Sequence, residues 1–253
     1  MKKLGLLMLC MALVSAAYAQ GQKQPQAKSQ KEMEAVQAIF AAPDAAARIK
    51  AADDLLLKFA DTEFKAVALQ VAAASAQEMN DFEKMVLYAE RTLEVDPKNY
   101  ASMLMLASGI AQRTREHDLD KEEKLARSEK YAKEALEILN AAPKPRPDIT
   151  DEQWDAAKKD FMAQAHEAMG LSAMVRKKYD DAITQFKTAV EMGATPDPAT
   201  KVRLASVYNS AGKYDEAIAV LDALLAEQDL HPTIRQFASQ EKLKAATGKA
   251  QKK

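Results

Sequence analysis

The side chains with most potential for chemistry are three histidines. His166 lies beside Glu167 on an expected helix, whereas His117 lies in a charged linker and His231 precedes Pro232. A general acid–base pair or a metal site needs such groups within hydrogen-bonding or ligand distance of one another. Their spacing predicts no such constellation, so we expect solvated or capping histidines.

A second candidate for chemistry is an acidic run. Asp118, Asp120 and the pair Glu122-Glu123 could bind a divalent cation. A calcium loop also needs a glycine at its tight turn and a closing glutamate, which this run does not supply. We therefore expect solvated charges and no metal.

Motifs of the common enzyme classes are absent from the sequence. It has no Gly-rich phosphate loop, no serine elbow and no HExxH helix. We favour a protein without catalytic activity and without a cofactor, and an enzyme is the minority alternative.

The first residues have the pattern of a cleaved secretory signal. Lys2 and Lys3 precede an apolar run over residues 4–14, and Ala17-Tyr18-Ala19 favours a cut after Ala19. A retained anchor is the alternative, although the run is short for a membrane span. The prediction is a signal peptide over residues 1–19 and a periplasmic or secreted protein.

Cys10 is the only cysteine and lies inside the predicted signal. It could carry a lipid, but the preceding Leu9 is bulkier than the small residue that lipoprotein processing prefers. The mature chain would then have no thiol, so no disulfide could stabilise it. Packing alone must hold the fold.

Composition and charge favour an all-α protein. The chain is 48% hydrophobic with 7 glycines, and no segment alternates for long with the two-residue period of a strand. A formal net charge of −1 argues against a nucleic-acid partner. No later apolar run reaches the length of a membrane span, so we expect no membrane span in the mature chain.

One short phrase recurs along the chain. Asn80-Asp81-Phe82, Lys177-Lys178-Tyr179 and Gly212-Lys213-Tyr214 each open an apolar-periodic helix. Tyr179 and Tyr214 are 35 residues apart, and so are Ala182 and Ala217. A period in the mid-thirties is typical of arrays of helical pairs.

These repeats predict how the chain is divided. We expect a disordered Gln- and Lys-rich linker over residues 20–31, a repeat domain of about five helix pairs plus a capping helix over 32–247, and a flexible basic tail over 248–253. Insertions at 113–123 and 141–160 stretch the period.

The second insertion includes the start of a long helix. Thr150-x-x-Gln153 is a capping-box signature, and apolar positions continue from Trp154 to Met169. This pattern predicts a helix of about 25 residues. Trp154 is either a staple that holds the start of this helix, which we favour, or an interaction hot spot.

Small residues recur at a fixed distance in the later repeats. Gly170 precedes Ala182 by twelve residues, and Ala205 precedes Ala217 by the same distance. This arrangement resembles the tetratricopeptide repeat family, in which small residues stand where two antiparallel helices cross closely. The resemblance implies a right-handed α-solenoid of helix pairs with a C-terminal capping helix, and a function in binding protein partners.

The resemblance is strong over residues 66–99 and 164–227 and moderate over 100–140. The family's concave groove implies a set of partner-binding positions here: Gln70, Gln77, Leu104, Ser108, Gln112, Gln164, Glu167, Leu171, Met174, Val202, Ser206 and Asn209. This groove lacks the Lys/Asn/Arg clamp with which some members bind a C-terminal carboxylate. An extended peptide or a partner helix suits it better.

The leading interpretation is a non-catalytic adaptor of a bacterial cell envelope that binds a protein or peptide in this groove. One alternative is a structural component that self-assembles. Another is a glycan-binding or enzyme-accessory subunit, which would need more aromatic residues in the groove. The partner's identity stays open.

Overall fold

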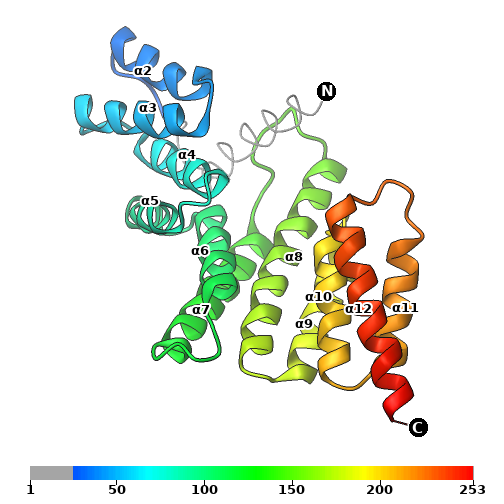
Figure 1. The fold of residues 1–253 in the computed structure, drawn as a ribbon. Helices are drawn as coiled ribbons and strands as arrows, with labels where there is room; N and C mark the ends of the chain where they lie inside the picture. The colour runs from blue at the N-terminus through cyan, green and yellow to red at the C-terminus, as the bar shows by residue number, and fades with distance from the viewer. Residues whose placement is uncertain (1–24, 253) are drawn as a thin grey trace. The chain divides into compact units, whose positions relative to one another are not determined.

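The computed structural model describes residues 25–252 (Figure 1). Within that range the chain forms helices and no strand: α2 (Gln30–Ala41), α3 (Ala45–Lys58), α4 (Lys65–Glu78), α5 (Phe82–Val95), α6 (Tyr100–Arg113), α7 (Lys121–Ala141), α8 (Asp151–Val175), α9 (Tyr179–Met192), α10 (Pro198–Ser210), α11 (Tyr214–Leu225) and α12 (Pro232–Gln251). The all-α class is confirmed, and a single helix, α12, follows the last helix pair. The predicted signal lies outside the described residues.

The chain forms two compact units. Within the described range, one comprises residues 25–109 together with 133–154, and the other comprises 110–132 together with 155–252. Within the described range, no helix is both long enough and apolar enough to cross a membrane.

In the first unit, α2 to α5 pack one on the next in chain order. Ile39, Leu55 and Leu69 are fully buried between them. The helices begin where side chains cap their free N–H groups: Asp44 Oδ1 accepts from Ala47 N at 2.8 Å and Asp81 Oδ1 from Lys84 N at 3.1 Å.

In the second unit, α9 to α12 likewise pack mainly on their neighbours in the chain. Phe186 is fully buried beside Ala182 and Val207, and a second cluster joins Leu221 and Leu224 of α11 to α12. Gly170 of α8 lets Phe186 approach, because a Cβ at this glycine would lie 3.0 Å from the ring.

The three turns that carry the recurring phrase share one backbone conformation. Asn80, Lys177 and Gly212 have φ values of 58°, 59° and 70°. This left-handed region suits glycine and asparagine and disfavours lysine. The shared conformation supports the alignment of the repeats made from sequence.

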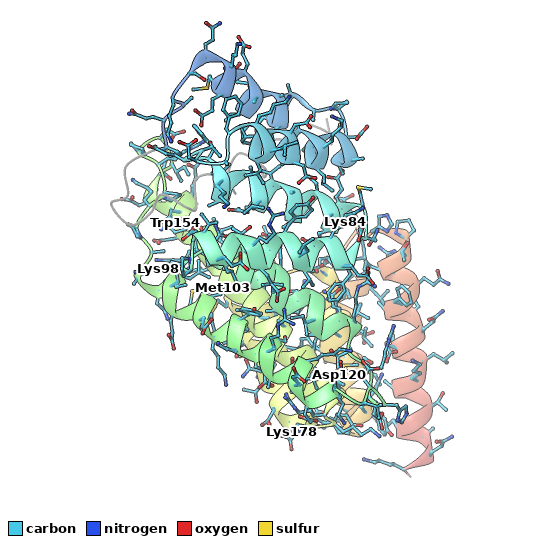
Figure 2. All side chains as sticks on the ribbon, turned by 90° about the vertical axis from the view of Figure 1, so that its left-hand side faces the viewer. Lys84, Lys98, Met103, Asp120, Trp154 and Lys178 are labelled. Carbon is cyan, nitrogen blue, oxygen red and sulfur yellow. The ribbon has the colours of Figure 1, made fainter. Side chains whose placement is uncertain are left out.

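The predicted long helix is confirmed, since α8 has 25 residues. Its capping box is formed: Gln153 N donates to Thr150 Oγ1 at 3.2 Å, and Thr150 N donates to Gln153 Oε1 at 3.0 Å. Trp154 is buried, and its indole N–H donates to the carbonyl of Ala142 at 3.4 Å (Figure 2). Trp154 therefore holds the start of α8 against the end of the preceding helix, as the staple prediction requires.

Two boundaries differ from the sequence prediction. Helix α2 begins at Gln30, inside the predicted linker, because Ser29 caps it. Helix α12 continues to Gln251, inside the predicted flexible tail, because Lys249 pairs with Asp215 and Lys252 Nζ donates to the Gly212 carbonyl at 2.9 Å.

Candidate binding surface

The three histidines lie apart from one another in the chain, and two of them contact polar groups of the fold. His166 Nδ1 lies 2.8 Å from Gln185 Oε1, and His231 Nδ1 accepts from Thr233 N at 3.3 Å as the cap of α12. His117 is exposed. His117 is therefore solvated and His231 is a helix cap, as expected, whereas His166 is half-buried and contacts Gln185.

The acidic run is occupied by ion pairs. Lys124 Nζ lies 3.3 Å from Asp118 and 2.9 Å from Asp120. A hydrogen bond from the Arg115 backbone lowers the pKa of Asp118, and a hydrogen bond from Arg176 lowers the pKa of Glu122. Among residues 25–252, no three His, Cys, Asp or Glu side chains come together as a metal site would require.

Two predicted groove positions in the first unit are wrong. Gln70 is 2% exposed and Leu104 is 3% exposed, so neither presents a surface to a partner. Gln70 Oε1 accepts from Asn99 Nδ2 at 2.9 Å, and Asn99 also caps α6, so the amide serves packing. Gln77 is exposed and Ser108 is half-buried.

In the second unit the predicted groove positions differ in how far their side chains are exposed to a partner. Gln112 and Gln164 are exposed. Leu171 and Met174 are half-buried against the cluster around Phe186, and Val202 packs on the cluster shared with α12. Glu167 is engaged within the fold, because it accepts from Thr200 Oγ1 at 2.9 Å and pairs with Arg203.

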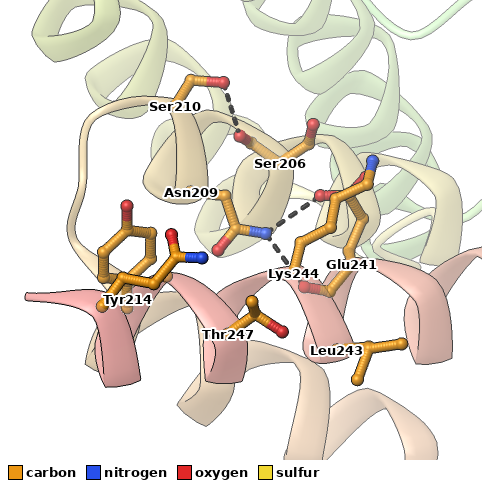
Figure 3. Close-up of a pocket in the computed structure, with 10 residues that line it drawn as sticks. Ser206, Asn209, Ser210, Tyr214, Glu241, Leu243, Lys244 and Thr247 are labelled. Atoms are coloured by element: carbon orange, nitrogen blue, oxygen red, sulfur yellow. Dashed lines mark hydrogen bonds and ion pairs between the residues drawn. The ribbon is translucent and has the colours of Figure 1, made fainter.

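Ser206 and Asn209 lie in a surface cavity of about 550 Å³, which we call the cap pocket (Figure 3). It is formed by α10, the first residue of α11 and the C-terminal half of α12. Its lining consists of Ser206, Asn209, Ser210, Tyr214, Glu241, Leu243, Lys244, Thr247, Gly248 and Gln251.

A hydrogen-bond network fixes the centre of the cap pocket. Asn209 Nδ2 donates to the Glu241 carbonyl oxygen at 3.0 Å and to Glu241 Oε2 at 2.9 Å (Figure 3). Lys244 Nζ lies 2.6 Å from Glu241 Oε1. The Glu241 side chain is only 13% exposed, whereas that of Lys244 is 67% exposed. The buried amide oxygen of Asn209 has no hydrogen-bond partner.

Gly248 shapes the end of the cap pocket. A Cβ at this position would lie 2.5 Å from Cε1 of Tyr214, so only glycine lets the ring pack directly on the helix backbone. Lys252 Nζ lies 5.2 Å from the centre of the same ring, within the range of a cation–π contact. These contacts anchor the end of α12 on the α10–α11 turn.

The sequence prediction missed every lining residue that α12 contributes, because the last helix was treated only as a cap. One signal was available: Gly248 is a glycine late in a polar helix, where it weakens the helix unless a neighbour needs the space. Helix α12 also exposes Phe237 and Leu243, which are 52% and 69% exposed. The helix therefore offers an apolar as well as a polar surface.

Comparison with known proteins supports the repeat assignment. Residues 173–240 match the tetratricopeptide repeat family. No curated protein matches the chain.

Among solved structures, the chain is similar to TTC0263, a thermophilic tetratricopeptide repeat protein of Thermus thermophilus. The TM-score is 0.57 at 18% identity, over 85% of this chain and 98% of that one. A tetratricopeptide repeat protein of Parabacteroides merdae gives a TM-score of 0.45 at 14% identity, covering 87% of this chain and 91% of that one. The assembly chaperone of RpL4, Acl4, gives 0.45 at 12% identity, covering 88% and 98%.

At 18% identity, the likeness to TTC0263 concerns the fold. The match over residues 173–240 begins near the end of α8 and includes α9 and α11, whose first residues, Tyr179 and Tyr214, are 35 residues apart. Residues 173–240 therefore match the tetratricopeptide repeat family, and the chain has the fold of a tetratricopeptide repeat protein over most of its length.

Proposed function

We propose that this protein is a non-catalytic adaptor that binds a protein or peptide partner on the first-helix side of its second unit. Tetratricopeptide repeats act as scaffolds for protein partners, and this chain carries the family's pattern over residues 173–240, which lie in the second unit. The observation that carries the proposal is the cap pocket: two predicted groove residues, Ser206 and Asn209, line a cavity there. Gln112 and Gln164 add exposed amides in the same unit.

Affinity capture with paired variants tests the proposal. The bait is the chain from Gln20 onward, and the test variant carries Gln112→Arg and Gln164→Arg. The control carries Ala219→Arg and Ala223→Arg, which are exposed on α11 and outside the predicted groove. We expect a partner that the wild type and the control recover and the test variant loses. Equal recovery by all three would contradict binding on the first-helix side.

We further propose export to a bacterial periplasm or to the medium. Lys2, Lys3, the apolar run over 4–14 and the small residues before Gln20 support it. Fractionation of the source cells followed by N-terminal sequencing tests it. A mature chain that begins at Gln20 is the expected result, and an uncut cytosolic chain would overturn it.

Self-assembly is the second candidate, and the exposure of Phe237 and Leu243 on α12 favours it. Both are large apolar side chains that a second copy of the chain would remove from water. Light scattering over a range of concentrations separates the two functions. A mass that rises with concentration and falls to the monomer in Phe237→Ser would support self-assembly.

A further inference from the structure

We propose that the cap pocket is a subsite for an uncharged side chain of the partner, specifically the carboxamide of an asparagine or glutamine. The inference rests on the proposed function, because it names the chemistry of one residue in the bound segment. It depends on three properties of the pocket: its charge balance, its unpaired acceptor and its remaining donors.

The charges of the cap pocket cancel. Glu241 and Lys244 are the two residues of its lining that are charged at neutral pH, and they form an ion pair of 2.6 Å. A second donor, Asn209 Nδ2, also contacts the Glu241 carboxylate. A charged ligand side chain would lose its hydration without gaining an unpaired opposite charge. An uncharged polar group avoids that penalty.

The unpaired group of the pocket is an acceptor. The Asn209 amide cannot exchange its nitrogen and oxygen, because the oxygen would then face both the carbonyl and the carboxylate of Glu241. Its oxygen is left buried and without a donor. In Figure 3 this oxygen points to the side of the pocket where Tyr214 and Thr247 lie. A buried acceptor without a partner is destabilising, so a ligand N–H that reaches it is strongly favoured.

A carboxamide also matches the other groups around this oxygen. It brings an N–H₂ donor for Asn209 and a carbonyl acceptor for the hydroxyl of Ser206 or Thr247 or for the exposed ammonium of Lys244. A cavity of about 550 Å³ has room for such a side chain and its flanking backbone. Thr247 and Gln251 line the same cavity and are exposed, so their side chains can rotate to admit a ligand without disturbing the core.

Titration with short peptides tests the inference directly. The probes are the acetylated and amidated peptides Ala-Ala-X-Ala-Ala with Gln, Leu, Glu or Lys as X. Binding to the ¹⁵N-labelled full chain is followed by NMR through the side-chain amide of Asn209. We expect the Gln peptide to shift this signal and to bind at least about tenfold tighter than the others, the effect of one well-placed hydrogen bond. Equal binding of the Leu, Glu or Lys peptide would overturn the inference, and so would no binding of the Gln peptide.

Matched variants locate the binding. Thr247→Trp fills the cap pocket from an exposed position, whereas Ala246→Trp places the same ring on the neighbouring exposed position outside the lining. The first should abolish binding of the Gln peptide, and the second should leave it unchanged. Loss in both variants, or in neither, would contradict the subsite.

The same variants keep this inference distinct from the proposed function. If a captured partner is lost with Gln112→Arg and Gln164→Arg but binds Thr247→Trp as well as wild type, the adaptor function stands and the subsite is wrong. If neither variant affects any captured protein, the proposed function itself fails.

Discussion

The α8–α9 pair and the α10–α11 pair have different residues at the equivalent point where their two helices cross. Gly170 and Phe186 meet in the first pair, and the positions 35 residues later hold Ala205 and Leu221. All four are buried. The larger Phe186 faces the smaller Gly170, and the smaller Leu221 faces the larger Ala205. The combined side-chain volume at the crossing is therefore similar in the two pairs.

The ends of the two first helices differ more than their crossings. Helix α8 has 25 residues and α10 has 13, and the added length lies at the N-terminus. Helix α8 begins at a capping box beside buried Trp154, whereas Asp197 caps α10 directly. The helix crossing fixes the 35-residue register between the two pairs. The N-terminus of each first helix is set by its own local contacts.

The largest expected effect comes from removing the contact that only α8 has. Trp154→Ala should lower the free energy of unfolding by about 3–5 kcal/mol, because it leaves a cavity and an unpaired Ala142 carbonyl. Urea unfolding followed by circular dichroism measures this. In the wild type, acrylamide should quench Trp154 slowly, and rapid quenching would show that the start of α8 is not held.

The second prediction tests the matched volumes. Gly170→Leu should destabilise by about 1–3 kcal/mol, because it overpacks the crossing with Phe186. The double variant Gly170→Ala with Phe186→Leu recreates the α10–α11 combination. It should be more stable than the sum of its single variants predicts, by about 0.5 kcal/mol or more. Strict additivity in a double-mutant cycle would refute the idea of a shared volume.

The third prediction concerns the turns of the two pairs. Gly212→Ala should destabilise by about 1 kcal/mol, because φ is 70° there. Lys177→Gly should stabilise by a similar amount at the equivalent position, where φ is 59°. Lys177 also pairs with Glu116 at 2.6 Å, so Glu116→Gln is the control that removes this exposed pair alone. Thermal unfolding that showed no gain for Lys177→Gly, after this correction, would mean that the turn carries no strain.

The smallest expected effect depends on pH. Arg176 at the end of α8 lies 2.7 Å from Glu122, whereas Ala211 holds the equivalent place after α10. The hydrogen bond from Arg176 lowers the pKa of the Glu122 carboxyl in the folded state. Its contribution to stability is therefore present above the unfolded-state pKa and is lost as the pH falls through the folded-state pKa.

Glu122→Gln should consequently lose less stability than wild type when the pH is lowered from neutrality to about 3. The measurement is a pair of urea titrations at the two pH values. The same acid-induced loss in both proteins would contradict a role for this pair.

The sequence predicted the repeats well, because their signals are local. The recurring phrase that contains Gly212, the capping box at Thr150 and the apolar period of α8 each involve residues close together in the chain. The ends of the described chain were harder. Helix α12 reaches Gln251 because Lys249 and Lys252 bind the α10–α11 turn, and no periodicity reports such contacts.

The candidate site was predicted only in part. Family spacing identified Ser206 and Asn209, since both follow the first-helix period. It placed Gln70 and Leu104 in the groove as well, although Asn99 draws Gln70 into a buried hydrogen bond. Whether a glutamine faces solvent or packs inward depends on a partner 29 residues away, which a helical period does not encode.

The stacking of α2 to α5, and of α9 to α12, on their neighbours in the chain has a consequence for how each unit folds. Contacts of short sequence separation require little loop closure, so such chains fold quickly and can fold in stages from one end. During synthesis, α11 leaves the ribosome before α12. Leu221 and Leu224 of α11 then stay exposed to water, because Ala238 and Ala245 of α12 complete the cluster that buries them. Until the last helix is synthesised, this incomplete core is an exposed apolar surface at which the nascent chain can aggregate or bind a chaperone.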